Sequence, residues 1–308
     1  MKRQKIQDHE TNDKRIKVGF CVAYDWSLLQ YSLPLIYDDS DLICLSIDQD
    51  RMSWTGVPYS WDETGFQNLI SSIDSQGKIK ILEENYHLPD LSPMQNEVRQ
   101  RNRIAKFFGD GGWYIQLDTD EFFLNFKGFV GYLKALRPAR KINVACPWIT
   151  LYKQSTEGFF YVDAERFDQI EFMQIATKWP TYEYGRRNGN FNLYTDFAIL
   201  HLSWARSEDE IWEKLNNWGH RDDFDIRQYF EQWQLLNVDN YRQYQNIHHL
   251  KPEAWPALGF IPAKSINELL GLEPVPIRLP ILPSDLKQRN NIWLSRLASI
   301  SRRLGIRH

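Results

Sequence analysis

Short apolar runs alternate with amphipathic stretches along the chain up to residue 117. The apolar runs are rich in β-branched residues, as buried strands of a parallel sheet are, and they cover 17–24, 42–47, 78–82 and 113–117. Between them the pattern predicts helices at 62–73 and 94–108, and an earlier helix that Asp25 and Ser27 can cap. The alternation predicts an α/β fold with a mixed, mainly parallel sheet flanked by helices.

From Asn143 onward the pattern changes to strand-like runs that polar turns separate. These runs lie at 144–152, 159–162, 171–176 and 192–202, and they predict a more antiparallel half. Ser207 then begins an amphipathic helix with the capping-box spacing to Glu210. Its apolar face is expected to carry Ile211, Trp212, Leu215 and Trp218 into the core.

The remainder of the chain is predicted to be partly helical and partly extended. A second helix is expected at 226–236, an extended wrapping segment where prolines are dense at 252–283, and a closing helix at 284–304. The closing helix has an apolar stripe surrounded by cations, which an interfacial membrane helix needs. A helix docked on the domain with a solvated basic face explains the same pattern, so both alternatives stay open.

Composition narrows the class of protein. Of the 308 residues 43% are hydrophobic and 25% charged, which is typical of a globular protein with a large core and excludes disorder and fibrous repeats. A formal net charge of −3 argues against a nucleic-acid-binding protein. The length favours one large domain with an appended segment over two equal domains.

The cysteines and the apolar runs indicate the compartment. Cys21, Cys44 and Cys146 are odd in number and have no metal-binding spacing, so we expect buried thiols in a reducing environment. The first 15 residues are charged and carry no apolar signal segment, and no apolar run approaches the 18 residues or so that a membrane span needs. We expect a cytoplasmic protein, at the inner face of the cytoplasmic membrane if the closing helix binds lipid.

The strongest chemical signal is the acidic run Asp118-Thr-Asp-Glu121, directly after the apolar run 113–117. Two carboxylates spaced i, i+2 at the end of a buried strand can bind one hard cation such as Mg²⁺ or Mn²⁺. Three other Asp-x-Asp pairs occur, at 39/41, 48/50 and 223/225. Ligands of open α/β sheets bind beyond the carboxyl ends of strands, and this context selects the pair that begins at Asp118.

These features together resemble a known family. The strand ending in Ser46-Ile-Asp48, the helix Asn96-Glu-Val-Arg-Gln-Arg-Asn-Arg103, the run Ile115-Gln-Leu-Asp-Thr-Asp-Glu121 and the later Leu200-His-Leu-Ser-Trp-Ala-Arg-Ser207 are similar to those of GT-A fold nucleotide-sugar glycosyltransferases, notably family 2 and related bacterial enzymes. The resemblance implies a polar leader at 1–15 and a catalytic domain at 16–250. Within that domain, 16–125 would bind nucleotide and 126–250 the acceptor, and 251–308 would form an extended and helical C-terminal segment.

The resemblance also implies a divalent cation. Asp120 would be the direct metal ligand, Asp118 a ligand or a ribose partner, and His201 the ligand that completes the coordination. Imidazole is tolerated by Mn²⁺ better than by Mg²⁺, so a histidine ligand favours Mn²⁺. Glu121 is expected to organise the metal loop.

Further residues would bind the donor, a UDP- or GDP-linked sugar. Tyr24, Asp25, Ser46 and Asp48 follow or end the first two strands, where the family binds the nucleoside. Arg99 and Arg103 share one helix face through their i, i+4 spacing and could stabilise the diphosphate. Arg186 could reach a phosphate or an acidic acceptor.

The acceptor side rests on weaker signals. An inverting transferase needs a carboxylate base, for which Asp196 is the first candidate and Glu183 the second. The usual Glu-Asp pair is absent, so a retaining mechanism stays open. Seven of the twelve tryptophans follow residue 178, and Trp179 and Trp204 are candidates for stacking on a sugar.

The sequence thus predicts a metal-dependent glycosyltransferase that acts on a glycan or lipid-linked glycan. Two alternatives remain: a nucleotidyltransferase with the same sheet, and a carbohydrate-binding protein on an inactive transferase fold.

Overall fold

A computed structural model describes residues 13–217 and 224–291, which form two compact units. The first unit takes the described residues up to Cys146 together with Met173–Phe197, and the second takes Pro147–Phe172 together with the described residues from Ala198. This division differs from the boundaries at 125 and 250 and from the one large domain expected from length. The physical reason is that strand β6 (Ile142–Gln154) contributes its first residues to one unit and the rest to the other.

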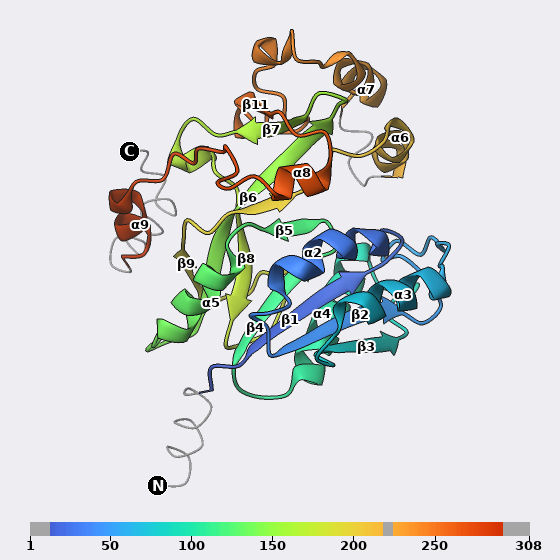
Figure 1. The fold of residues 1–308 in the computed structure, drawn as a ribbon, viewed down its shortest axis with the longest axis vertical. Coiled ribbons are helices and arrows are strands. Elements are labelled where there is room, and N and C mark those ends of the chain that lie inside the picture. Colours follow the sequence, from blue (N-terminus) through green and yellow to red (C-terminus); the bar gives the residue numbers. More distant parts are fainter. Residues whose placement is uncertain (1–12, 218–223, 292–308) are drawn as a thin grey trace, which may run out of the picture. The chain divides into compact units, whose positions relative to one another are not determined.

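The first unit is built on a mainly parallel sheet, which confirms the predicted fold class. Figure 1 shows β1 between β2 and β4, and the parallel order is β4-β1-β2-β3. The strands span Ile16–Val22 (β1), Leu42–Asp48 (β2), Ile79–Glu84 (β3) and Trp113–Asp118 (β4). The next neighbour of β4 is antiparallel to it, β8 (Phe172–Thr177). The short β5 (Glu121–Phe123) follows β4 in the chain, and β9 (Phe191–Tyr194) pairs in parallel with the start of β6.

Helices follow these strands much as the pattern predicts. They are α2 (Leu29–Ile36), α3 (Glu63–Ile73), α4 (Pro93–Phe108) and α5 (Phe126–Ala135). A capping box between Ser92 and Gln95 begins α4. The predicted cap by Asp25 is wrong: a short 3₁₀ turn, η1 (Trp26–Leu28), follows Asp25 without a side-chain cap, and α2 begins after it. The sequence pattern did not reveal α5, which the Asn125 side chain caps.

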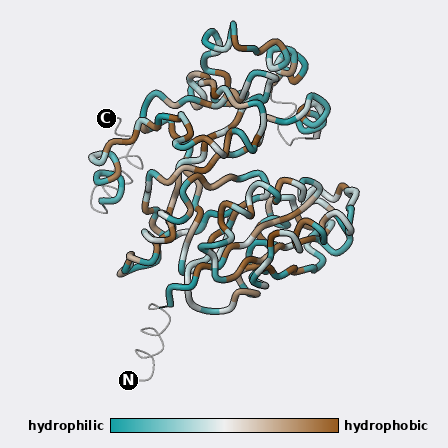
Figure 2. Tube along the Cα trace, viewed as in Figure 1, coloured by the Kyte–Doolittle hydropathy of each residue, from teal (hydrophilic) through white to brown (hydrophobic). Residues whose placement is uncertain are grey.

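A glycine in β1 lets α4 approach the sheet closely. A Cβ on Gly19 would lie 2.4 Å from Cγ2 of Ile104, so a larger residue would push the helix away. The expected buried thiols are confirmed, since Cys21, Cys44 and Cys146 are all buried and free, and burial raises the pKa of Cys21 to about 12. Figure 2 shows the hydrophobic colouring of these central strands.

The second unit has its own strands. The later part of β6 pairs antiparallel with β7 (Phe159–Asp163), and β7 pairs antiparallel with β11 (Ala257–Ile261). Strand β10 (Ile199–His201) pairs in parallel with Trp148, Ile149 and Thr150 of β6. The single strand predicted at 192–202 is therefore wrong: β9 and β10 are separate strands, and they belong to different units.

Helices and short turns complete the second unit. The helices are α6 (Glu208–Asn217), α7 (Ile226–Leu235), α8 (Ile266–Leu270) and α9 (Pro283–Arg289). The 3₁₀ turns are η2 (Phe167–Gln169), η3 (Tyr241–Gln243) and η4 (Pro252–Ala254). The predicted capping box of α6 is confirmed by N–H donation from Ser207 to Glu210 Oε2 at 3.0 Å and from Glu210 to Ser207 Oγ at 3.4 Å. The pair 223/225 has a structural role at Asp225, whose Oδ1 accepts two N–H groups at the start of α7.

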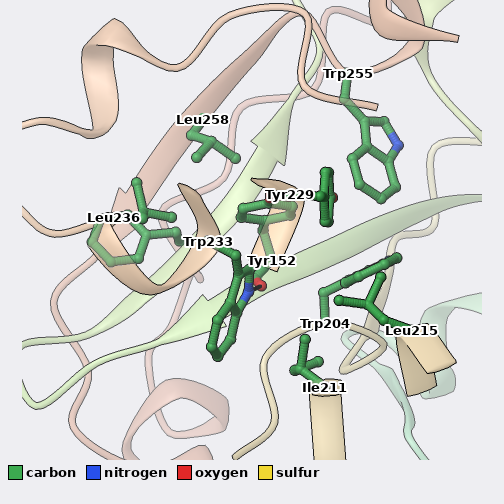
Figure 3. Close-up of a cluster of buried hydrophobic side chains, with 10 residues drawn as sticks. Tyr152, Trp204, Ile211, Leu215, Tyr229, Trp233, Leu236, Trp255 and Leu258 are labelled. Atoms are coloured by element: carbon green, nitrogen blue, oxygen red, sulfur yellow. Dashed lines mark hydrogen bonds between the residues drawn. The ribbon is translucent and has the colours of Figure 1, made fainter. Parts of the chain in front are cut away.

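Aromatic side chains dominate the core of the second unit, as Figure 3 shows. Trp204 lies there with Tyr152, Ile211 and Leu215. The prediction that Trp212 is a core residue is wrong, because its side chain is 36% exposed and packs beside Phe230 at a ring distance of 5.0 Å. The other tryptophan predicted for this face, at 218, lies outside the described residues.

The proline-rich part of the chain is more regular than the composition predicts. Strand β11 and helix α8 both fall within the predicted extended segment 252–283. The predicted closing helix 284–304 is shorter in the structure, because α9 ends at Arg289 with Asn290 as its C-cap. The predicted apolar stripe from Trp293 lies outside the described residues. Among residues 13–217 and 224–291, no helix is long and apolar enough to cross a membrane.

Candidate functional site

The strand order of the first unit reverses direction between β1 and β4. Successive strands β1, β2 and β3 extend to one side, and β4 lies on the other side of β1. Cys21 of β1 is opposite both Ser46 of β2 and Asp118 of β4, so the carboxyl ends of these strands meet at one edge. In open α/β sheets the crevice at such a switch point is where ligands bind. Asp118 stands at this edge, and Tyr24 and Asp25 directly follow β1.

Two buried arginines bind the Asp118 carboxylate. Arg101, from α4, places Nη2 2.9 Å from Oδ1 and 3.2 Å from Oδ2. Arg186 places its own Nη2 2.7 Å from Oδ2. The arginine side chains are only 2% and 3% exposed, whereas that of Asp118 is 29% exposed. Two cations therefore bind the carboxylate of Asp118, the first residue of the predicted acidic pair, and its side chain remains partly exposed to solvent.

Further carboxylates complete this acid–arginine cluster. The same Nη2 of Arg186 lies 2.9 Å from Oε2 of the fully buried Glu121, and Arg101 Nε lies 2.9 Å from Oε1 of Glu97. Oε2 of Glu121 also accepts the Asp118 N–H at 3.0 Å, so Glu121 holds the backbone at the end of β4. Asp120 interacts electrostatically with Asp118, so among the described residues the cluster contains four carboxylates and two guanidiniums.

The cluster shifts the pKa of its members. Burial acts to raise the pKa of Asp118, but the charges of Arg101 and Arg186 outweigh it, and the net shift is downward. Burial acts to lower the pKa of each arginine, and their carboxylate partners outweigh it, so both stay charged. Asp118 is therefore ionised throughout the neutral pH range.

Arg186 lies on a turn that is hydrogen-bonded to α4 and that places its side chain in the cluster. Asn102 clamps this turn by donating to the Tyr182 carbonyl at 2.9 Å and accepting the Tyr182 N–H at 3.0 Å. Gly185 has a φ of +55°, in the left-handed region that favours glycine, and brings the chain back toward the cluster. Nη1 of Arg186 is buried and has no hydrogen-bond partner among the described residues. This N–H group is available to an anion.

Arg101 was not predicted as a site residue, whereas Arg99 and Arg103, two positions before and after it, were. Arg99 donates to the backbone carbonyls of Asn85 and Tyr86. Arg103 lies 3.4 Å from Glu84 in a half-exposed ion pair. Both bind β3 or the loop after it, and the structure does not bring them to Asp118. The helix face that they share is turned away from the face that carries Arg101.

Asp48 has a structural role that conflicts with the predicted ribose contact. Its carboxylate accepts four backbone N–H groups, those of Asp50 at 3.0 Å, Met52 at 3.2 Å, Tyr86 at 2.7 Å and His87 at 3.0 Å. A carboxylate offers about four lone-pair directions, so none is left for a ligand. We therefore correct the prediction: Asp48 joins two loops.

Ser46 is also fully buried, and Gln100 donates to its carbonyl at 2.9 Å and to its hydroxyl at 3.2 Å. Tyr24 is different, because it is 60% exposed beyond β1 and its ring meets that of Tyr59 edge-on at 6.4 Å. Burial raises the pKa of Tyr59 to about 12. Asp25 follows Tyr24 and is half-buried. The exposed ring of Tyr24 is thus the predicted nucleoside contact best placed to meet a ligand.

The two predicted bases are both exposed. Glu183 lies in the turn before Arg186, and its N–H donates to the Arg187 carbonyl at 2.9 Å. Asp196 follows β9 and raises the pKa of Tyr132, although burial of that tyrosine is the larger cause. Neither carboxylate lies in an environment that marks it as a base.

Whether a divalent cation fits the acid–arginine cluster depends on its donors. No group of three or more His, Cys, Asp or Glu side chains within the described ranges is arranged to hold a metal ion. Mg²⁺ is commonly bound by one or two carboxylates with substrate phosphates completing its shell. The partly exposed carboxylate of Asp118 and the neighbouring carboxylate of Asp120 fit that mode. The predicted third ligand, His201, belongs to the second unit and stacks on Trp148 at 3.8 Å.

The two tryptophans predicted to stack on a sugar differ in environment. Tyr152 stacks on the ring of Trp204 at 6.4 Å, and Nζ of Lys214 lies 4.7 Å from the centroid of that ring. Protein groups therefore cover the ring in the core of the second unit, and the prediction that Trp204 stacks on a sugar is wrong. Trp179 is half-buried just after β8, and its backbone N–H donates to Thr177 Oγ1 at 3.1 Å. A sugar contact therefore stays a prediction for Trp179 alone.

Comparison with known proteins adds little to this geometry. No family model matches the chain, and no curated protein matches it significantly. Among solved structures, one similar chain is the 4-diphosphocytidyl-2C-methyl-D-erythritolsynthase of Anaerococcus prevotii DSM 20548. The TM-score is 0.30 with 14% identity, over 53% of this chain and 69% of the other. A likeness of this size says nothing about activity.

Proposed function

We propose that this chain is a glycosyltransferase that moves a sugar from a UDP- or GDP-linked donor to a hydroxyl group of a glycan or lipid-linked glycan. The observation that carries the proposal is the acid–arginine cluster at the switch point of the parallel sheet. An edge of this kind is where α/β proteins bind nucleotides. A cluster that combines acidic and cationic groups suits a diphosphate bound together with its metal ion.

The donor diphosphate would meet two kinds of charge. Nη1 of Arg186 is buried and has no hydrogen-bond partner in the part of the chain that the structure describes, and a hydrogen bond to a phosphate oxygen would satisfy it. Asp118 and Asp120 would hold a divalent cation, which supplies positive charge to the departing nucleoside diphosphate. His201 belongs to the second unit, so the carboxylate oxygens of Asp118 and Asp120 are the proposed ligands, and they suit Mg²⁺ and Mn²⁺ alike.

The nucleoside and the acceptor have separate candidate groups. The exposed ring of Tyr24 offers a stacking surface next to the switch point, with Asp25 beside it as a hydrogen-bond acceptor. An acceptor hydroxyl would lose its proton to Asp196 or, failing that, to Glu183, for an inverting reaction. Both are exposed, so each is accessible to a substrate.

The test is calorimetric titration of the purified chain with UDP and GDP, each with and without Mn²⁺ or Mg²⁺. We expect binding of one nucleotide that strengthens with the metal and is lost in Asp120→Asn. Asp110→Asn removes an exposed carboxylate before β4 and is the matched control. A panel of nucleotide sugars, followed by release of free sugar, then identifies the donor. Absence of nucleotide binding, or release of pyrophosphate from nucleoside triphosphates instead of sugar transfer, would overturn the proposal.

A further inference from the structure

The second unit contains a pocket of its own, with a volume of about 480 Å³. The residues that line it come from β6, from β7 and the segment after it up to Glu171, and from 248–255 and 277–279. The volume falls within the roughly 300–1,000 Å³ that small-molecule sites occupy. No residue of the acid–arginine cluster lines this pocket, so any ligand of the pocket is a separate one.

Aromatic rings line the pocket and are held rigidly. Trp255 is 6% exposed and lies edge-on to the core residue Tyr152 at 5.8 Å (Figure 3). Tyr161 of β7 is opposite Gly259 of β11, and a Cβ on that glycine would lie 2.2 Å from Cζ of Tyr161. The glycine therefore allows the tyrosine ring to lie across the sheet. Flat, fixed rings of this kind suit the C–H face of a sugar ring.

One carboxylate in the pocket has no hydrogen-bond or ion-pair partner among the described residues. Asp163 lies two residues after Tyr161 on β7, so both side chains are on the same face of the strand. Its carboxylate makes no hydrogen bond or ion pair with any described residue, although it is half-buried. Burial and, to a smaller extent, Glu165 raise its pKa. An unpaired carboxylate at a partly buried position costs stability, and hydroxyl groups of a ligand would offset that cost.

A histidine supplies a donor to the same pocket. Nδ1 of His248 accepts the N–H groups of Leu250 at 3.1 Å and Lys251 at 3.0 Å. An accepting Nδ1 places the proton of the neutral ring on Nε2. Burial lowers the pKa of His248, so the ring is neutral at physiological pH. The pocket thus joins aromatic faces, a free carboxylate acceptor and a neutral imidazole donor.

We propose that this pocket binds a neutral saccharide unit, with Tyr161 and Trp255 against the sugar and Asp163 accepting hydrogen bonds from its hydroxyl groups. The assignment of that saccharide as part of the glycan acceptor rests on the proposed function. Binding of the saccharide itself does not, because none of these residues belongs to the donor site.

The test is binding of the nucleotide-free protein to an array of neutral and acidic oligosaccharides. The best neutral ligand is then titrated against the protein by calorimetry. Asp163→Asn should weaken this affinity about tenfold or more, because the ligand loses hydrogen bonds to a charged acceptor. Glu165→Gln, two residues away and exposed, is the matched control and should bind as the wild type does. Gly259→Ala should also weaken binding, by displacing the Tyr161 ring.

Stability measurements separate binding from folding. Asp163→Asn should be at least as stable as the wild type, because it replaces a partly buried charge by a neutral amide. Weakened binding without lost stability supports the site. Absence of any neutral ligand, preference for acidic glycans, or equal affinity in Asp163→Asn would overturn it. Asp120→Asn should keep its saccharide affinity, so failure of the donor site and failure of this pocket give different results.

Discussion

The guanidinium of Arg186 lies 2.7 Å from the carboxylate of Asp118, a residue 68 positions earlier in the chain. The same nitrogen lies 2.9 Å from Glu121, whose side chain is fully buried. One guanidinium therefore bridges two carboxylates at the carboxyl end of β4. This ion pair links the turn that carries Arg186 to the carboxyl end of β4, and it places charges of both signs at the candidate site.

Removing this cation should destabilise the fold. Arg186→Met leaves the buried Glu121 carboxylate without its partner, and breaking a buried ion pair in this way costs about 3–5 kcal/mol in the free energy of unfolding. Arg187→Met changes the next residue of the same turn, which is exposed, and should cost no more than about 0.5 kcal/mol. Urea denaturation of both variants measures the difference. Equal stability of the two would show that the buried ion pair contributes nothing.

The contribution of Asp118 should depend on pH in one direction. Its pKa in the folded protein is below the usual 3.8, so the folded state favours the ionised carboxylate. The stabilisation is therefore present above that value and is lost as the pH falls through the folded pKa. The difference in unfolding free energy between the wild type and Asp118→Asn should stay constant from about pH 8 to about pH 5 and shrink below about pH 4. A difference that changes between pH 5 and 8 would assign it to another group.

The parallel sheet was predictable because a buried strand carries its own pattern. The four apolar runs needed no knowledge of their neighbours, and each became a strand of the first unit. The split between β9 and β10 was not predictable in this way, because 192–202 contains enough apolar residues to suggest one strand. The division depends on which strand partners each half finds, at Ile142–Ala145 and at Trp148–Thr150, and pairing is not a local property.

The candidate site shows the same limit. Asp118 was found because an acidic run after an apolar strand is visible in the sequence. Arg101 was missed although a signal existed: it falls three and seven residues before Ile104 and Phe108, on the buried face of α4. An arginine on such a face needs an acidic partner. No such signal showed that the carboxylate of Asp48 accepts four N–H groups, because two of them come from the distant residues Tyr86 and His87.

Two glycines should respond oppositely to the same substitution. Gly19→Ala would force Cβ against Ile104 and push α4 from β1, at a cost of about 1–3 kcal/mol. The shift would also move Arg101, one turn earlier on that helix, so nucleotide affinity should fall. Gly131 lies inside α5 with nothing near its Cβ position, and Gly131→Ala should stabilise the protein by about 0.5–1 kcal/mol. Thermal unfolding measures both signs, and a destabilised Gly131→Ala would contradict the open space at that Cβ position.

A buried lysine caps a helix in the second unit. Nζ of Lys153 donates to the carbonyl oxygens of Trp233 at 2.8 Å, Gln234 at 2.7 Å and Leu236 at 2.9 Å, at the end of α7. Lys153→Met leaves these carbonyls without their donor, and we expect a loss of about 1–3 kcal/mol. Lys264→Met removes an exposed lysine of the same unit and should change stability by less than about 0.5 kcal/mol. Denaturant titrations decide the matter, and comparable losses in both variants would rule out the capping role.

The exposed ring of Tyr24 should affect nucleotide binding and leave folding unchanged. A tyrosine that is 60% exposed buries little apolar surface, so Tyr24→Ala should keep the unfolding free energy within about 0.5 kcal/mol. Loss of a ring that stacks on a base costs about 1–3 kcal/mol in binding free energy, which is roughly a tenfold loss of affinity for the preferred nucleotide. Tyr24→Phe retains the ring and should retain the affinity, because stacking does not need the hydroxyl group. Calorimetry of the three proteins with the nucleoside diphosphate separates these cases. Unchanged affinity in Tyr24→Ala would show that the base binds to another surface. A loss in Tyr24→Phe would show that a hydrogen bond from the phenol, and not stacking, holds the nucleotide.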